Sequence, residues 1–164
     1  MSREHEYELQ VVWTGNDGDG TRTYRSYRRD HTVGAAGRPD LPGSSDPAFR
    51  GDVGRWNPEQ LLVASLSQCH LLWYLHLASV NGIVVVGYED APTGTMIEQH
   101  DGGGEFREVV LRPRVTIAQG DPALAAELHG RVGDVCFIAR SVNFPVRHEP
   151  VILQQADVES APAH

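Results

Sequence analysis

The chain has 164 residues, enough for one domain with a sizeable core, and its 40% apolar and 22% charged residues exclude global disorder. The net charge of −8 makes nucleic acid a poor partner, because phosphate binding needs a basic field. All fourteen basic residues are arginine, which excludes chemistry that needs a lysine, such as a Schiff base or a P-loop.

The first third of the chain predicts a β-hairpin and a long loop. Residues 6–14 alternate apolar and polar side chains, as a strand does, and residues 15–20 form a turn rich in glycine and aspartate. Residues 21–33 predict a second, arginine-rich strand. Residues 34–56 are rich in glycine, proline, serine and aspartate, and a loop of this length is typical of a functional or partly disordered segment.

A long helix is predicted after this loop. Asn57 is a favourable N-cap, Pro58 suits the first helical position, and Glu59 suits the positive end of the helix. The pair Asn81-Gly82 provides a stop signal. Because the residues between are apolar almost all round, we expect the helix to be buried rather than to lie on a surface.

The sequence favours a cytoplasmic protein without a membrane span. Residues 1–10 are charged, unlike a signal sequence, and serine, glutamine and histidine interrupt the longest apolar run, residues 61–78. In the cytosol Cys69 and Cys136 are not expected to form a permanent structural disulfide. They are interpreted as inert thiols, redox-active thiols or metal ligands.

The second half of the chain predicts a strand-rich stretch, a helix and a last strand. The strand-rich stretch covers residues 82–118 with a turn at 100–105, and the helix covers residues 121–141 with a bend at one of its glycines, Gly130 or Gly133. The last strand covers residues 144–154, and residues 156–164 are expected to fray. This order predicts a single α+β domain over residues 1–164, with an antiparallel sheet and two main helices.

The two cysteines are the leading candidates for chemistry. Cys69 lies in the predicted long helix, and Cys136 lies sixty-seven residues later in the second. Cysteine is among the most buried residue types, so core packing is the competing interpretation. A thiol peroxidase needs one thiolate to attack a peroxide and a second thiol to condense with the resulting sulfenic acid. Two cysteines satisfy this count, although the sequence does not show that they meet.

The position of Cys69 requires a cation from outside its own helix. Cys69 lies about three turns into the predicted helix, and the dipole effect fades after the first turn. An arginine therefore has to lower its pKa, and Glu59 could orient that guanidinium through a bidentate pair. The competing interpretations are a first-turn carboxylate favoured by the dipole and ordinary surface arginines. The candidate arginines are Arg22, Arg25, Arg28, Arg29, Arg50 and Arg55.

Histidines offer a metal site as another interpretation. His70 and His76 share the long helix with Cys69, and Cys69 and His76 lie on one helical face because they are seven residues apart. His31 and His148 could add ligands. No C-x₂-C or H-x₃-H spacing is present, so the zinc signal is weak. His70 and His76 are more often core or interface histidines.

Aromatic side chains accompany both thiols. Trp73 lies one turn beyond Cys69 on about the same face. Ordinary packing is the competing interpretation for every aromatic residue here. A cleft lined by any of them would be apolar and would suit an organic molecule. The other aromatic candidates are Trp56, Tyr74, Phe137 and Phe144.

Two motifs resemble those of a known family. Residues 57–70, NPEQLLVASLSQCH, resemble the first cysteine motif of the OsmC/Ohr family, the osmotically inducible and organic hydroperoxide resistance proteins. Residues 133–146, GDVCFIARSVNFPV, resemble the second cysteine motif. The resemblance covers most of the chain. Its most specific feature is the Asn-Pro-Glu helix start with a cysteine ten residues after the glutamate.

The resemblance implies a fold and an activity. The fold is OsmC-like and α+β, with antiparallel sheets packed around a long buried central helix, in an intertwined homodimer whose subunits both build each active site. The activity is thiol-dependent reduction of organic hydroperoxides to alcohols, in oxidative-stress defence. Cys69 matches the peroxide-attacking cysteine, Cys136 the resolving cysteine, and Glu59 the partner of the catalytic arginine. No bound cofactor is implied, and an external dithiol, lipoyl-linked in some members, reduces the disulfide.

The catalytic arginine carries over less directly. The osmotically inducible branch places it just before the Asn-Pro-Glu turn, which favours Arg50 in DPAFRGD, while the hydroperoxide resistance branch places it on an N-terminal strand, which favours Arg22. We prefer Arg50 because of its spacing to Asn57. His70 stands where an apolar residue is common after the first cysteine, and the second cysteine lacks a following proline, so pocket shape and substrate preference are open.

Two rival functions remain on the same fold. One is a non-enzymatic protein that binds a small apolar ligand, in which the cysteines merely pack. The other is a metal-binding protein.

Overall fold

A computed structural model describes residues 3–156 and contains two compact units, one ending at Leu61 and the other beginning at Leu62. The division falls inside the first turn of the long helix α1, Pro58–Val80. The expectation of a single domain over residues 1–164 stays a prediction. The tail expected to fray lies outside the described residues, except for Ala156.

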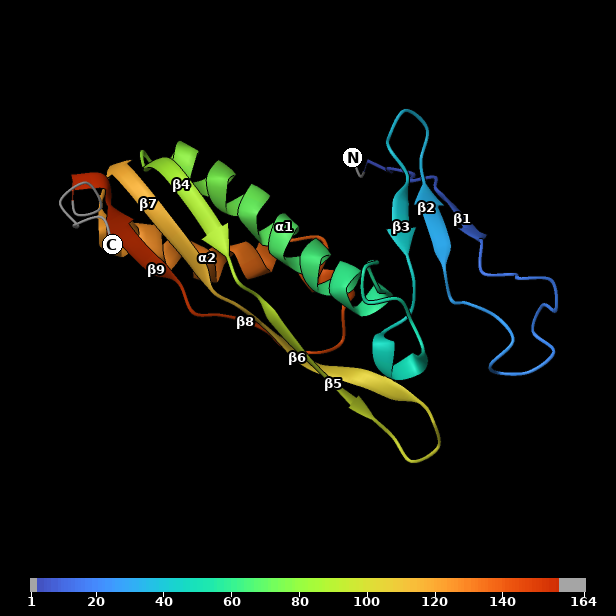
Figure 1. Ribbon diagram of the computed structural model, residues 1–164. Coiled ribbons are helices and arrows are strands. Elements are labelled where there is room, and N and C mark those ends of the chain that lie inside the picture. Colours follow the sequence, from blue (N-terminus) through green and yellow to red (C-terminus); the bar gives the residue numbers. More distant parts are fainter. Residues whose placement is uncertain (1–2, 157–164) are drawn as a thin grey trace. The chain divides into compact units, whose positions relative to one another are not determined.

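The first unit contains a three-stranded antiparallel sheet in the order β1-β2-β3 (Figure 1). Its strands are β1, Gln10–Trp13, β2, His31–Gly34, and β3, Leu41–Gly43. The predicted first strand contains β1, but most of the predicted arginine-rich arm forms turns and becomes a strand only at residue 31. The preceding turn, residues 15–20, is stabilised by its own side chain, because Asn16 Oδ1 accepts the N–H groups of Gly18 and Gly20.

The segment predicted as a long loop, residues 34–56, has more structure than expected. It contains β3 and a 3₁₀ turn, η1, Pro47–Phe49. The Asp46 carboxylate accepts the N–H of Ala48 and so caps η1. Trp56 closes the segment by donating its backbone N–H to the carbonyl of Pro42, at 3.1 Å.

Both predicted ends of α1 are confirmed. Asn57 Oδ1 accepts the backbone N–H of Gln60 at 2.8 Å, and Gln60 Oε1 accepts the N–H of Asn57 at 3.2 Å, which is a reciprocal capping box. At the other end Gly82 adopts a left-handed φ of 74°. The N–H groups of Gly82 and Ile83 bond to the carbonyls of Ser79 and Ala78, as in a Schellman motif.

The expected burial of α1 holds along one face. The buried residues recur every fourth position, at Leu66, His70, Tyr74 and Ala78. Apolar side chains on the rest of the helix are exposed, with Leu72 at 66%. Among the described residues α1 is the one helix long and apolar enough to cross a membrane, by length and composition only, a test that the core helix of a soluble protein also passes.

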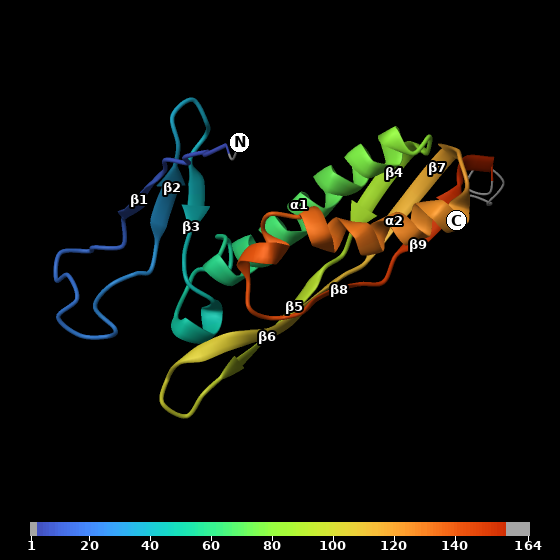
Figure 2. The ribbon, with the colours of Figure 1, turned by 180° about the vertical axis from the view of Figure 1, so that it is seen from behind.

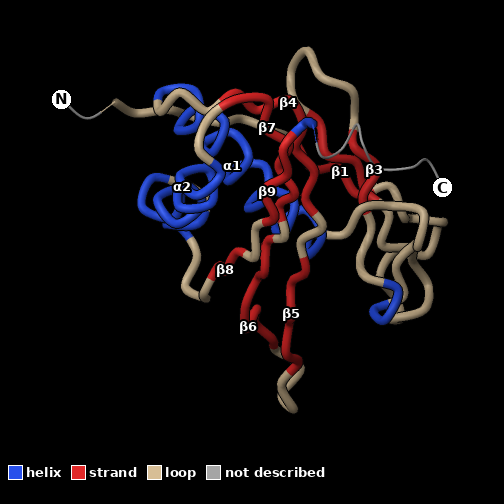
Figure 3. The backbone as a smooth tube through the Cα atoms, turned by 90° about the vertical axis from the view of Figure 1, so that its left-hand side faces the viewer, coloured by secondary structure: helices blue, strands red, loops and turns tan. Residues whose placement is uncertain are grey.

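The second unit is built on two three-stranded sheets (Figures 1 and 3). Their orders are β4-β7-β9 and β5-β6-β8. Within them, β4 with β7 and β5 with β6 are antiparallel, while β6 with β8 and β7 with β9 are parallel. The strands are β4, Val84–Asp90; β5, Thr93–Glu98; β6, Gly104–Leu111; β7, Pro113–Gln119; β8, Val146–His148; and β9, Val151–Gln154.

The parallel pairs depart from the antiparallel sheet that the sequence predicted. The predicted last strand is divided by Glu149-Pro150 into β8 and β9, because proline has no N–H for a ladder. Only Arg112 separates β6 from β7, so these two strands run in one direction. The chain returns after the second helix in that same direction, and β8 and β9 therefore pair in parallel with β6 and β7 in turn.

The second helix, α2, runs over Pro122–Val135 and is shorter than predicted. Asp121 caps it by accepting the N–H of Ala123. The helix passes both of its glycines without a break and ends at Cys136, whose backbone is extended at φ −68° and ψ 113°. A short 3₁₀ turn, η2, Ala139–Ser141, covers the rest of the predicted segment.

The two helices cover the same face of the β4-β7-β9 sheet, as the opposite views of Figures 1 and 2 show. The main core lies between these layers and includes the second cysteine, Cys136. A smaller cluster formed by Leu66, Val109 and Leu111 continues the core beneath β6. The members of the main core are Tyr74, Ala78, Ile83, Val115, Ile117, Ala125, Leu128, Val132 and Cys136.

Candidate functional site

The packing of α1 against α2 brings the two cysteines together. The Tyr74 hydroxyl donates to the carbonyl of Ala125 at 3.1 Å, and one helical turn away on α1 His70 is hydrogen-bonded to His129. Beyond these contacts, Cys69 on α1 packs against the core cluster that contains Cys136 at the end of α2, close enough to influence the ionisation of that thiol. Both cysteines are free thiols, and their proximity in the core is the arrangement that a disulfide between them would need.

The two thiols differ in burial and ionisation. Cys69 is half-buried, whereas Cys136 is 1% exposed. Burial, and then the neighbouring Cys69 thiol, raises the pKa of Cys136 to about 11, although the backbone N–H groups of Ala139 and Ile138 act in the opposite direction. Cys136 is therefore protonated at neutral pH, and Cys69 is the thiol that a dissolved molecule can reach.

A groove of about 370 Å³ opens beside Cys69, with Leu72, Trp73, His76 and Phe137 as its other lining residues. The rings of Trp73 and Phe137 meet edge to face with centroids 5.6 Å apart. The lining is apolar except for Cys69 and His76. The groove therefore suits an organic molecule better than a small polar one.

Two of the five aromatic candidates line this groove, Trp73 and Phe137. Tyr74 is fully buried under α2, and Phe144 packs against Phe106 with centroids 5.4 Å apart. Both therefore serve in packing, as the competing interpretation expected. Trp56 belongs to the first unit, where its backbone pairs with the segment around β3.

The histidines separate into two environments. His76 lies in the groove, with its ring 5.8 Å from that of Trp73. His70 points instead into the core, where its Nε2 lies 2.8 Å from Nδ1 of His129. The sequence interpretation did not include His129. A signal existed, since His129 lies seven residues before Cys136 and therefore on the same face of the helix.

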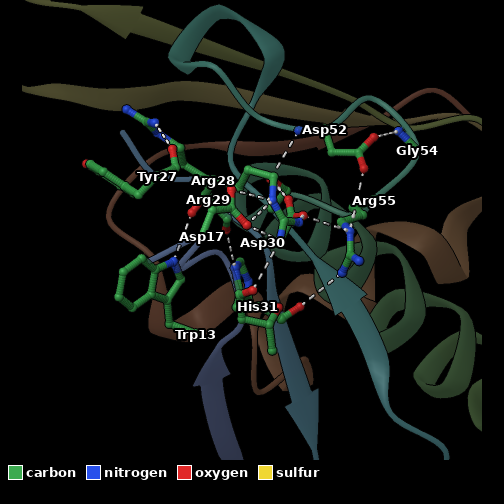
Figure 4. A network of polar contacts seen from close by, with 12 residues as sticks. Trp13, Asp17, Tyr27, Arg28, Arg29, Asp30, His31, Asp52, Gly54 and Arg55 are labelled. Carbon is green, nitrogen blue, oxygen red and sulfur yellow. Dashed lines mark hydrogen bonds and ion pairs between the residues drawn. The ribbon is translucent and has the colours of Figure 1, made fainter. Parts of the chain in front are cut away.

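Three of the six candidate arginines have partners within the first unit (Figure 4). Arg28 pairs with Asp17 and with the buried Asp30. The guanidinium of Arg29 lies over the rings of Tyr24 and Tyr27, at 4.3 and 4.1 Å from their centroids. Arg55 lies 3.8 Å from Asp30 and 3.6 Å from Asp52. These contacts hold the turns and the loop before α1 together.

The side chains of Arg22, Arg25 and Arg50 have no ion pair or hydrogen bond to any other residue of the range 3–156. Arg50 is also the one non-glycine residue in that range with a positive φ, at 67°. It ends η1 in the left-handed conformation that glycine ordinarily supplies. A residue with a Cβ pays backbone strain in this conformation.

Glu59 lies in the first turn of α1, as predicted. Its Oε2 atom is buried and finds no hydrogen-bond partner among the described residues. The predicted pair between Glu59 and an arginine is therefore not formed in this part of the chain. Burying a carboxylate oxygen without a hydrogen-bond partner costs free energy, and an ion pair with a cation would remove this cost.

Within residues 3–156, no three histidine, cysteine, aspartate or glutamate side chains converge closely enough to hold a metal ion. His70, His76 and Cys69 do not form such a group, although they share one helix. The metal interpretation therefore gains no support from the geometry.

The comparisons with known proteins point in one direction. The model of the family described as OsmC-like protein matches residues 51–150. A solved OsmC-like protein of unknown function from Vibrio cholerae is 28% identical, with a TM-score of 0.81 over 90% of this chain and 100% of that one. An organic hydroperoxide resistance protein from Legionella pneumophila is 18% identical, with a TM-score of 0.64 over 92% of this chain and 99% of the other.

A further solved structure shares the fold. An organic hydroperoxide resistance protein from Elizabethkingia anophelis, solved with thiocyanate bound, is 16% identical, with a TM-score of 0.64 over 93% of this chain and 100% of the other. No curated protein matches the sequence.

Proposed function

The chain belongs to the OsmC-like protein family, and from this premise we propose that it is a thiol-dependent peroxidase that reduces organic hydroperoxides to alcohols. The observation that carries the proposal is a pair of free thiols close together in the core, one of which, Cys69, lines an apolar groove. In this proposal the accessible thiol, Cys69, attacks the hydroperoxide. The buried thiol, Cys136, then attacks the oxidised Cys69 and forms the disulfide. The organic hydroperoxide resistance proteins that share this fold support the same class of reaction.

The reaction needs two steps. The Cys69 thiolate attacks the terminal oxygen of the hydroperoxide, the O–O bond breaks, and the alkoxide leaves as an alcohol after taking a proton. Cys69 is then a sulfenic acid. The sulfur of Cys136 attacks the sulfur of Cys69, the S–O bond breaks, and water leaves with the thiol proton. An external dithiol, for which a lipoyl-linked one is our first candidate, reduces the resulting disulfide.

The first step needs a cation for the thiolate and for the oxygen that leaves. We assign this role to Arg50, with Arg22 as the alternative, because both guanidinium groups lack partners within residues 3–156. The left-handed backbone of Arg50 favours it over Arg22. Glu59, whose buried Oε2 lacks a partner in the same range, would orient the guanidinium.

We further propose that the protein acts as a homodimer in the cytoplasm, without a membrane, a nucleic acid or a bound cofactor. The exposed apolar side chains of α1, which include Leu72, Leu75 and Val80, are the surface that a second copy would cover. A Leu72→Glu variant should lower the measured mass by half in light scattering. An unchanged mass would contradict this assignment of the interface.

The peroxidase proposal is tested by following hydroperoxide loss. Reduced protein is mixed with cumene hydroperoxide or hydrogen peroxide and with dihydrolipoamide or a thioredoxin-type reductant. We expect faster loss of the organic hydroperoxide, and loss of turnover in Cys69→Ser. If Cys69→Ser consumes the peroxide as fast as the unmodified protein, the proposal is wrong.

Separate variants examine the arginine. Arg50→Gln should slow the first step by at least about a hundredfold, the scale expected for loss of one charge-stabilising donor. Arg28→Gln is the matched control, since its guanidinium is occupied by Asp17 and Asp30. If Arg22→Gln slows the first step and Arg50→Gln does not, the catalytic role belongs to Arg22.

The apolar groove also favours a second candidate, the binding of a small apolar ligand without turnover. This function predicts a ligand retained in native mass spectra and thiols that do not respond to hydroperoxide. Cys69→Ser would then keep the ligand, because the groove walls remain.

A further inference from the structure

A pair of buried histidines lies beside the thiol pair, and the peroxidase proposal gives it no role. His70 Nε2 and His129 Nδ1 are 2.8 Å apart, so one ring donates its N–H to the other. The two residues are 5% and 0% exposed. His129 is also held by Tyr74, whose ring stacks on it with centroids 3.9 Å apart. The orientation of the His70 ring is therefore fixed by a hydrogen bond to a second, tightly packed ring.

His70 also lines a small cavity with Cys136, and His148 closes one side of it. The cavity volume of about 30 Å³ is sufficient for one water molecule. Nδ1 of His70 has no hydrogen-bond partner among residues 3–156. A water in the cavity would connect this nitrogen with the sulfur of Cys136.

We propose that His70 is the proton acceptor for the Cys136 thiol when Cys136 attacks an oxidised Cys69, and that His129 is the positioning residue that holds the His70 ring. The proposal extends the resolving step of the proposed function. The S–H bond of Cys136 breaks, and its proton passes through the water to Nδ1 of His70. The electron pair left on sulfur forms the bond to Cys69, and the hydroxide that leaves takes the proton back as water.

A base is needed because Cys136 is a poor nucleophile as it stands. Burial and the neighbouring Cys69 thiol raise its pKa to about 11, so very little thiolate exists at neutral pH. Burial and His148 lower the pKa of His70 to about 4, and the weaker influence of Asp90 on β4 acts in the opposite direction. His70 therefore remains an uncharged acceptor over the physiological range. The other titratable groups around it are His129 on α2 and Arg147 on β8.

The test can avoid peroxide altogether. Reduced protein is treated with less than one equivalent of 5,5′-dithiobis(2-nitrobenzoate). The accessible Cys69 attacks the reagent and releases one thionitrobenzoate, which leaves a mixed disulfide on Cys69. Cys136 then attacks the Cys69 sulfur and releases the second thionitrobenzoate, and its thiol proton passes to His70 and on to solvent. The rate of the second release measures the activation of Cys136 alone.

His70→Gln is the informative variant, because the glutamine amide can replace Nε2 in the contact with His129 but cannot accept a proton. We expect an unchanged first release and a second release slowed by at least about a hundredfold, the low end for general base catalysis. His100→Gln is the matched control, because His100 is exposed in the turn between β5 and β6. An unchanged second release in His70→Gln would overturn the proposal.

The pH profile of the unmodified protein provides a test that does not depend on a variant. With His70 as acceptor, the second release should be nearly level from about pH 6 to about pH 9, because the imidazole is uncharged throughout. A rate that rises tenfold with each pH unit would show that only free thiolate reacts, and would refute the role of His70. His70→Gln should show that steep dependence.

The same assay separates this inference from the peroxidase proposal. A protein whose disulfide closure with the aromatic reagent is slowed by His70→Gln, but which consumes no hydroperoxide, would contradict the peroxidase function and would support the role of His70. A protein that consumes hydroperoxide, and whose disulfide closes equally fast in His70→Gln, would support the peroxidase function and contradict the role of His70.

Discussion

Burial determines the ionisation of the titratable side chains packed around the thiol pair. Loss of hydration is the first cause of the shifted pKa of His70, His129, Tyr74 and Cys136. In each case the uncharged form is favoured: the pKa of Tyr74 rises to about 12, and that of His129 falls to about 3. These four side chains are therefore uncharged around pH 7, and a proton that moves among them passes between neutral groups.

The two buried histidines should make the protein sensitive to acid. Their pKa values fall from an ordinary 6.5 to about 4 for His70 and about 3 for His129. Between pH 6.5 and these values the two histidines bind protons in the unfolded chain but not in the folded chain. The free energy of unfolding is therefore at its full value above pH 6.5 and decreases as the pH falls toward these values. The slope approaches about 1.4 kcal/mol per pH unit for each histidine. The free energy of unfolding, measured with urea at each pH from 7 to 4, should fall less steeply with falling pH in His70→Gln than in the unmodified protein. In His100→Gln its dependence on pH should be unchanged.

The helices illustrate which features a sequence determines locally. The ends of α1 were predicted because Asn57, Pro58 and Gly82 act through their own backbone and nearest neighbours. The end of α2 was predicted six residues too late. There the local pattern stays apolar, and the helix stops because Cys136 turns into an extended conformation. Its sulfur then accepts the N–H of Ala139.

Two glycines form a matched pair for testing these helix ends. Gly82 has a φ of 74°, and a Cβ there would meet no atom within 4 Å, so Gly82→Ala should lower the free energy of unfolding by about 1 kcal/mol through backbone strain alone. Gly130 lies exposed within α2, where a Cβ also meets nothing. Gly130→Ala should therefore raise stability by up to about 1 kcal/mol. Equal effects of the two changes in chemical denaturation would contradict this account.

At the scale of the whole chain, the α+β class and both cysteine-bearing segments could be predicted, while the pairing of strands could not. The strand-rich stretch 82–118 is one long hairpin divided between two sheets by breaks at Pro92 and Arg112. A parallel third strand in each sheet depends on where the chain returns after α2, which is a long-range property. The proximity of Cys69 to Cys136 and the His70–His129 pair depend on the same packing, so no local pattern could show them.

Because the two thiols lie close together in the core, we expect the disulfide to form without rearranging the helices and to act mainly on the unfolded chain. Closing a loop of sixty-seven residues stabilises a protein by about 4 kcal/mol in the chain-entropy description. Urea unfolding of oxidised and reduced protein should therefore differ by that amount. Cys136→Ser should unfold identically under both conditions, since it cannot close the loop. An oxidised protein no more stable than the reduced one would show that the disulfide strains the packing of α1 on α2, and the thiol pair would then not be preorganised for resolution.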